Sequence, residues 1–177
     1  PLETMEQSIA LSQLHPGAVH LHQGKSYLVT ELDLLGRIAY VVPTDVSYYT
    51  QAKELTDLKV ISIRKEKAGL GVSSYLGDVE VTSTVVGFKK KMQFSEEVVG
   101  EEPLDLPPQC FETVALWFDI PDEAIDKIME SHLDFAGGLH AAEHVSIAML
   151  PLFALCDRND LGGVSTVIHP DTGRPQI

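Results

Sequence analysis

The sequence predicts an α+β fold: a small antiparallel β-barrel or sandwich lobe, followed by a helical lobe built on one long buried helix. Between residues 18 and 94, short runs rich in β-branched and aromatic residues alternate with turn residues, which is typical of antiparallel strands. Between Val145 and Cys156 only Ser146 is polar. A helix that is apolar nearly all round is buried in a larger protein or in a membrane.

The change of pattern along the chain predicts two lobes and a connection. Residues 1–94 form the β-rich, barrel-like lobe, and residues 110–177 form the helical lobe. Residues 95–109 are acidic and contain proline, so we expect a loop or an extended connection there. The last residues begin an element that does not continue, which predicts a truncated C-terminal end and a chain cut from a longer protein.

The first lobe begins with a weak helical pattern over residues 1–15, which ends at the turn His15-Pro16-Gly17. Strands are then predicted at 18–23, 26–34, 38–50, 58–66, 71–88 and 89–94. Several short strands in succession favour a small antiparallel barrel or sandwich.

The helical lobe begins with one more strand, over residues 112–120. Pro121 then opens a helix that runs to about His132, because proline suits a helix start and the two acids after it suit the helix dipole. The central helix is predicted at about 138–156. Its apolar run is shorter than the ~20 residues that cross a bilayer, and Pro151 interrupts it, so we expect burial inside protein.

Charge and cysteine content restrict the function classes. The formal net charge of −13 disfavours a nucleic-acid clamp, although it leaves room for a local basic patch. Cys110 and Cys156 cannot form a disulfide framework or a CxxC zinc site. We interpret both as buried thiols and expect a reducing, cytoplasmic location, with no membrane span.

His140, Glu143 and His144 match the H-x-x-E-H pattern of one class of zinc peptidases. Histidines at i and i+4 share a helix face, so both can bind one zinc ion while a glutamate acts as general base. Glu143 is the last glutamate in the chain. The downstream candidates for a third ligand are Cys156, Asp157, Asp160, His169 and Asp171. The alternative is a polar first turn that caps a buried helix.

Lys89, Lys90 and Lys91 lie between Phe88 and Phe94, a combination that offers cations and stacking rings to single-stranded nucleic acid. The alternative is a solvated strand edge protected by lysine, with the phenylalanines facing the core. The basic residues Arg64, Lys65 and Lys67 allow the same two interpretations. No glycine-rich stretch matches a phosphate-binding loop, so we expect no bound ATP and no ATPase activity in this chain.

Four segments together resemble one group of helicases. They are HPGAVHLHQGKSYLV, VVGFKKKMQF, EEPLDLPPQCFETVALWF and GGLHAAEHVSIAMLPLFALCDRNDLGGVSTVIHPDTGRP. The group is the superfamily 2 DEAD/DEAH-box helicases with a C-terminal cysteine-cluster domain, and the resemblance covers about residues 13–177.

The resemblance implies that the parent protein is an ATP-dependent 3′-to-5′ DNA helicase associated with DNA repair. Its motor lobes, with ATP and Mg²⁺, would precede this region, and four zinc-binding cysteines would follow it. Neither Cys110 nor Cys156 stands in for those ligands. The residues that match the signature without an assigned role are His140, Glu143, His144, Asp157, Arg158, Asn159 and Asp160.

The sequence therefore predicts a non-catalytic accessory domain between the motor and the cysteine cluster, with no catalytic, cofactor or metal residue of its own. It would position DNA or the motor lobes, with Lys89, Lys90 and Lys91 as the nucleic-acid contacts. The two rival interpretations are a zinc-dependent hydrolase that uses the H-x-x-E-H residues, and a protein-interaction module that makes no contact with DNA.

Overall fold

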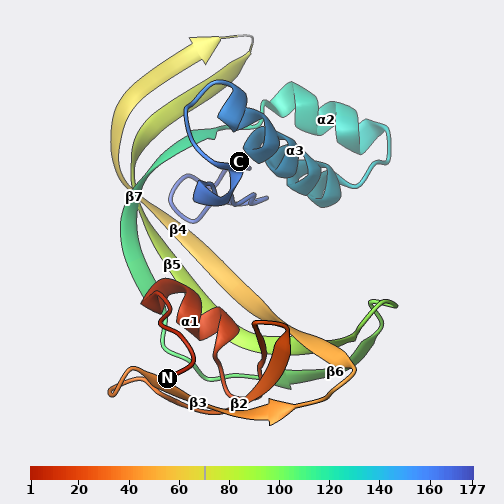
Figure 1. Ribbon diagram of the computed structural model, residues 1–177. Helices are drawn as coiled ribbons and strands as arrows, with labels where there is room; N and C mark the ends of the chain where they lie inside the picture. The colour runs from red at the N-terminus through yellow and green to blue at the C-terminus, as the bar shows by residue number, and fades with distance from the viewer. Residues whose placement is uncertain (70) are drawn as a thin grey trace. The chain divides into compact units, whose positions relative to one another are not determined.

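The computed structural model describes residues 1–69 and 71–177, and for Asn159 the backbone alone. The chain forms two compact units, which we call unit 1 and unit 2. Unit 1 consists of Pro1–Asp57 and Thr82–Cys110, and unit 2 consists of Leu58–Val81 and Phe111–Ile177. Two long strands, β4 (Tyr48–Gly69) and β5 (Val72–Met92), contribute residues to both units (Figure 1).

Unit 1 begins with helix α1 (Gln7–Gln13) and a three-stranded antiparallel sheet. The sheet has the order β1-β2-β3, with β1 at Val19–His22, β2 at Lys25–Asp33 and β3 at Ile38–Thr44. The turn between β1 and β2 has positive φ angles at both Gln23 (48°) and Gly24 (75°). Positive φ at both central residues is the geometry of a type I′ turn, whose twist matches that of the two strands it joins.

The second sheet has four strands. Its order is β4-β5-β6, with β6 at Val98–Pro103, and β7 (Gln109–Phe118) also pairs with β5. The structure confirms an α+β fold with antiparallel strands. Of the predicted barrel or sandwich, the barrel is not found, because neither sheet is closed among the described strands. An alternating pattern identifies strands and their buried faces, whereas closure depends on pairing between distant strands.

Strand β6 lies in the stretch that the sequence suggested as a loop or an extended connection. It pairs antiparallel with the end of β5, where Lys89 lies opposite Glu101 and Lys90 opposite Gly100. Opposite charges on facing strands stabilise such a pair, and this cross-strand complementarity is invisible in a local pattern.

The core of unit 1 joins the turn after α1 to both sheets. Ala18, Val29 and Phe88 are buried, and so is the whole side chain of His15. The His15 ring packs against the Phe88 ring, with centroids 4.5 Å apart. The residues after α1 therefore serve as core residues as well as turn residues.

The core of unit 2 is organised around Trp117 on β7. Its ring stacks on Tyr75 of β5 at a centroid distance of 5.6 Å. The Tyr75 hydroxyl donates to the carboxylate of Asp119 at 3.2 Å, and the Gln176 amide donates to the same carboxylate at 2.7 Å. Backbone bonds between Phe118 and Ile177 add to this contact, so the last described residues are held against the end of β7.

Among the described residues of unit 2, β7 is followed by helices α2 and α3 (Figure 1). Helix α2 spans Asp122–Glu130 directly after Pro121, as predicted. Helix α3 spans Phe135–Met149 and is capped by Asp134, whose carboxylate accepts from the Gly137 amide at 3.1 Å. Two 3₁₀ turns, Leu150–Leu152 and Arg158–Asp160, complete the helical segment.

The predicted central helix is shorter and less buried than expected. It ends at Met149 because Pro151 lacks an amide hydrogen and cannot continue the α-helical bonds. Among its described residues only Leu139 and Glu143 are buried, and Val145 is 61% exposed. An apolar sequence predicts that a helix is packed against other parts of a protein. The described residues pack against only one face of α3.

The cysteines also differ from expectation. Cys110 is exposed and Cys156 is half-buried, and neither forms a disulfide. The apolar neighbours of Cys156 are themselves exposed, with Leu155 fully open to solvent, which explains why the thiol is not in a core. No described helix is long and apolar enough to span a membrane.

Candidate functional site

The three predicted nucleic-acid contacts on β5 are each paired with a carboxylate. Lys89 pairs with Glu101 at 3.4 Å, Lys90 with Glu102, and Lys91 with Glu96 at 3.6 Å. The hydrogen bond that Lys90 donates to Glu102 raises the pKa of Lys90. The two flanking phenylalanine rings lie in different environments, because Phe88 is buried in the core whereas Phe94 is fully exposed. The carboxylates of β6 and the adjoining turn thus offset the positive potential that phosphate binding needs.

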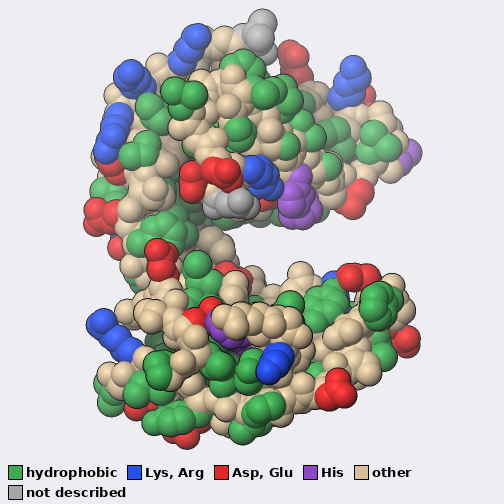
Figure 2. Space-filling view, in the orientation of Figure 1, with side chains coloured by type: hydrophobic (Ala, Val, Ile, Leu, Met, Phe, Trp, Pro, Cys, Tyr) green, Lys and Arg blue, Asp and Glu red, His purple; other side chains and the backbone are tan. Residues whose placement is uncertain are grey.

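A second set of lysines lies on β4, in unit 2. Lys59, Lys65 and Lys67 occupy alternate positions with Ile61 and Ile63, so all five share one face of the strand. All five are exposed, and none of the three lysines has an ion pair among residues 1–69 and 71–177. We call these five residues the β4 outer face. In Figure 2, basic side chains gather along the part of unit 2 where the second half of β4 runs.

The opposite face of β4 is used for packing. Leu58 and Val60 line a small pocket with Trp117. Arg64 pairs with Asp78, which also accepts from the Ser62 hydroxyl at 2.7 Å. The structure therefore separates Arg64 from Lys65 and Lys67, which the sequence placed in one cluster. The alternation of side chains along a strand could have distinguished Arg64 from Lys65 and Lys67 in the sequence.

The H-x-x-E-H residues lie in the middle of α3 and form a small hydrogen-bonded group. His140 contacts Glu143 at 3.3 Å and His144 at 3.1 Å, and both histidines are exposed. Glu143 is buried and accepts from the Ser165 hydroxyl at 2.6 Å. The glutamate thus ties α3 to the segment that follows it, rather than facing an open site as a general base would.

The signature residues after α3 form a turn. The Asp157 amide donates to the Asp160 side chain at 3.1 Å, and Arg158 donates to the Leu161 carbonyl at 3.5 Å. The side chain of Asn159 lies outside the described residues. The visible contacts are those of a polar turn that ends the helical segment.

A metal-competent group appears elsewhere, in unit 1. Within the described ranges, Glu3, His20 and His22 are the only His, Cys, Asp or Glu residues whose ligand atoms gather in threes within 4.8 Å of one another. The predicted H-x-x-E-H group does not qualify. Among the described residues, neither Cys110 nor Cys156 belongs to such a group.

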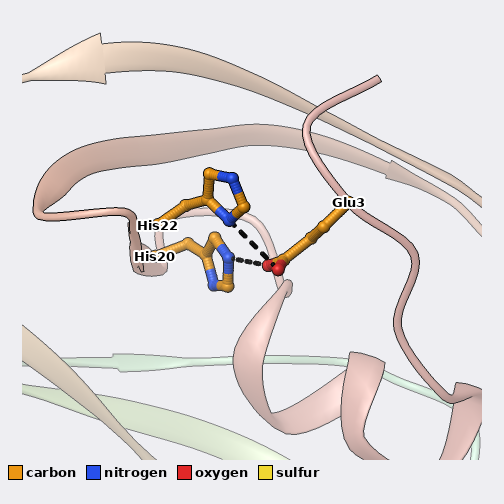
Figure 3. Close-up of side chains that lie close together, drawn as sticks. All are labelled: Glu3, His20 and His22. Atoms are coloured by element: carbon orange, nitrogen blue, oxygen red, sulfur yellow. Dashed lines mark hydrogen bonds and ion pairs between the residues drawn. The ribbon is translucent and has the colours of Figure 1, made fainter.

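In this group the two imidazoles lie next to each other, and each directs one ring nitrogen at the Glu3 carboxylate (Figure 3). Its Oε1 is 2.5 Å from Nε2 of His20, and its Oε2 is 3.1 Å from Nδ1 of His22. The hydrogen bond from His20 lowers the pKa of the Glu3 carboxyl. The histidine spacing was visible in the sequence, because residues i and i+2 of a strand share a face. The approach of Glu3 was not.

Glu3 and His20 also line a pocket of unit 1, which has a volume of about 760 Å³. Its walls come from the N-terminal segment, α1, the β2–β3 hairpin and residues 107–109. The lining is mostly apolar, with side chains such as Leu11, Leu14 and Ile38. Ligand pockets commonly combine an apolar wall of this kind with a few converging polar groups.

No family model matches the chain, but individual proteins do. The ATP-dependent helicase YprA of Bacillus subtilis is 36% identical over 176 residues, which are 98% of this chain and 23% of YprA. The ATP-dependent helicase HRQ1 of Saccharomyces cerevisiae is 29% identical over 162 residues, which are 90% of this chain and 15% of that protein.

Solved structures agree with these matches. The crystal structure of the DUF1998 helicase MrfA bound to DNA aligns with 97% of this chain at a TM-score of 0.66 and 32% identity, and the chain covers 23% of MrfA. MrfA bound to DNA and AMPPNP aligns at a TM-score of 0.59 and 28% identity, over 97% of this chain and 20% of that one. The chain aligns with one region of ATP-dependent DNA helicases. It spans less than a quarter of the length of the relatives it matches.

Proposed function

We propose that this chain is a non-catalytic accessory region of an ATP-dependent DNA helicase, and that it helps to hold DNA against the motor of that enzyme. The observation that carries the proposal is the alignment of almost the whole chain with MrfA in a DNA-bound crystal structure. The chain contains no phosphate-binding loop motif, so ATP would be bound by other parts of the parent protein.

The β4 outer face is the surface best suited to the DNA backbone. Its three lysines have no carboxylate partner among the described residues, whereas the three lysines of β5 each have one. Unpaired lysines gain more from a phosphate than paired ones, because no existing ion pair is lost. The alternative to DNA binding is a purely structural role for these lysines. Lysine on an exposed edge strand discourages association with the edge of another sheet.

The proposal is tested with the purified chain by measuring DNA binding and ATP hydrolysis together. We expect weak, salt-sensitive binding to single-stranded and duplex DNA in fluorescence anisotropy, and no ATP hydrolysis above buffer with or without DNA. ATP turnover by the chain would contradict its non-catalytic role. Absence of DNA binding at low salt would contradict the DNA-holding role.

A second candidate function, contact with other domains of the same helicase, is favoured by the exposed apolar residues of the helical segment. They are Val145, Met149, Leu152, Phe153 and Leu155. Large exposed apolar patches mark interaction sites, and more than three quarters of YprA lies outside the region matched here. Slower amide exchange in α3 on adding the separately purified motor domains would support this role, and unchanged exchange would contradict it.

A further inference from the structure

We propose that Glu3, His20 and His22 form a binding site for a divalent transition-metal ion of the zinc class, which fastens the N-terminal segment to strand β1. The inference concerns unit 1 alone and is independent of the helicase assignment. It rests on the convergence of two imidazole nitrogens and one carboxylate from segments far apart in the sequence (Figure 3).

The donor set suits such an ion. Two histidines and one carboxylate are the protein ligands of many catalytic zinc sites, with a fourth position left for water or a substrate. The two imidazole nitrogens disfavour the alkaline-earth ions, which prefer sites built from oxygen alone. The set therefore favours Zn²⁺ and its first-row neighbours over Mg²⁺ and Ca²⁺.

The distances are close to those of a bound ion. Metal–ligand bonds of about 2.0–2.1 Å at tetrahedral angles place neighbouring ligand atoms about 3.3 Å apart. The contact between His22 and Glu3 measures 3.1 Å, and that between His20 and Glu3 measures 2.5 Å. The three ligand atoms all lie within 4.8 Å of one another, so a movement of the Glu3 side chain, which belongs to an irregular segment, would make room for the ion.

The surroundings are suited to a site with three protein ligands. The side chains of His20 and His22 are only 11% and 17% exposed, so strand β1 and its neighbours fix the rings. Glu3 is 38% exposed and lies on the wall of the 760 Å³ pocket. An ion held there would have a protein-covered side and an open side, and the open side provides the fourth position.

The effect of the ion would be to order the first residues of the chain. Residues 1–6 have no helix or strand of their own, and Glu3 connects them to β1 across seventeen positions of sequence. A metal bond that closes a chain segment of this length removes conformational freedom from it. Zn²⁺ should therefore slow amide exchange in residues 2–6 as well as bind.

The test uses the 177-residue chain with His140→Gln and His144→Gln in place, because that exposed i, i+4 pair could itself bind Zn²⁺. Titration with zinc chloride, followed by calorimetry, should show one bound ion per chain in this background. Glu3→Gln or His22→Gln should weaken the affinity at least tenfold, since loss of even an outer-shell partner costs about 10–100-fold. His132→Gln, at an exposed histidine outside the group, is the matched control and should bind normally.

Amide exchange provides a second measurement of zinc binding, which can be interpreted even if a variant is less stable. Zinc should slow exchange in residues 2–6 of the background chain and leave the Glu3→Gln chain unchanged. The proposal is overturned if the chain binds no zinc, or if binding is unaffected by Glu3→Gln and His22→Gln. Binding that disappears only when His140 and His144 are replaced would overturn it as well.

Discussion

The imidazole of His15 packs against the phenyl ring of Phe88 with ring centroids 4.5 Å apart, and both side chains are fully buried. Its Nδ1 donates to the Pro16 carbonyl at 3.0 Å, whereas its Nε2 is buried without a hydrogen-bond partner among the described residues. A charged imidazolium in this position would leave a buried N–H unsatisfied. The packing therefore requires the neutral ring, and burial lowers the pKa of His15.

Acid should destabilise unit 1 through this residue. The pKa of His15 lies below its unfolded value of about 6.5, so between those two values the unfolded chain binds more protons than the folded chain. The stabilisation is complete above pH ~6.5 and is lost as the pH falls below it. Urea titrations at pH 7.5 and 5.5 should show this fall, with a limiting slope of about 1.4 kcal/mol per pH unit for one proton.

His15→Phe should flatten this pH dependence, because the phenyl ring cannot titrate. His132→Gln, at an exposed position in unit 2, should leave the dependence unchanged. An equally steep acid response in the His15→Phe chain would show that other groups cause it.

A close backbone contact predicts that Gly77→Ala destabilises unit 2. A Cβ at Gly77 would overlap the Ser62 carbonyl oxygen and lie 2.9 Å from the Trp117 ring. Overpacking of this kind costs about 1–3 kcal/mol, and thermal unfolding would measure it. Gly138→Ala is the matched control, because its Cβ would meet nothing within 4 Å in the interior of α3 and should stabilise by about 0.5–1 kcal/mol. Equal stability of the two variants would contradict the packing described here.

Glu143→Ala should reduce stability by about 1 kcal/mol, because it leaves the Ser165 hydroxyl without its 2.6 Å acceptor. His140→Gln, at an exposed position, should change stability by less than about 0.5 kcal/mol. A hydrolase would show a different pattern. Stoichiometric zinc that disappears in the His144→Gln chain, with peptidase activity lost in the Glu143→Ala chain, would restore the zinc-hydrolase interpretation.

The features that could be predicted from the sequence are those encoded locally. Strands β1 and β2 and helix α2 after Pro121 follow from β-branched runs, turn residues and the proline itself. The expected strand at 38–50 is instead divided between β3 and β4, and the two strands expected at 71–88 and 89–94 are the single strand β5. The end of α3 before Pro151 is equally local, although the expected helix ran past that proline. The buried role of His15 could not be seen, because it depends on Phe88, more than seventy residues away.

The candidate sites depended even more on distant pairing. Lys89 looked available to DNA until β6 brought Glu101 opposite it. The histidines at 20 and 22 were visible as a pair on one strand, but the fold brings in Glu3 from a segment without a local pattern. The exposure of α3 was not predicted, because the hydrophobicity of a helix indicates that it packs against something but does not indicate which residues it packs against.

The most direct test of the proposed DNA-holding role compares two triple variants of the chain in DNA-binding titrations at several salt concentrations. Replacing the β4 lysines (K59Q/K65Q/K67Q) should weaken binding and reduce the slope of log K against log salt by about one per lysine that contacts a phosphate. Replacing the paired lysines of β5 (K89Q/K90Q/K91Q) should change that slope little. Unaltered affinity and slope in the β4 variant, or a larger loss in the β5 variant, would contradict the account.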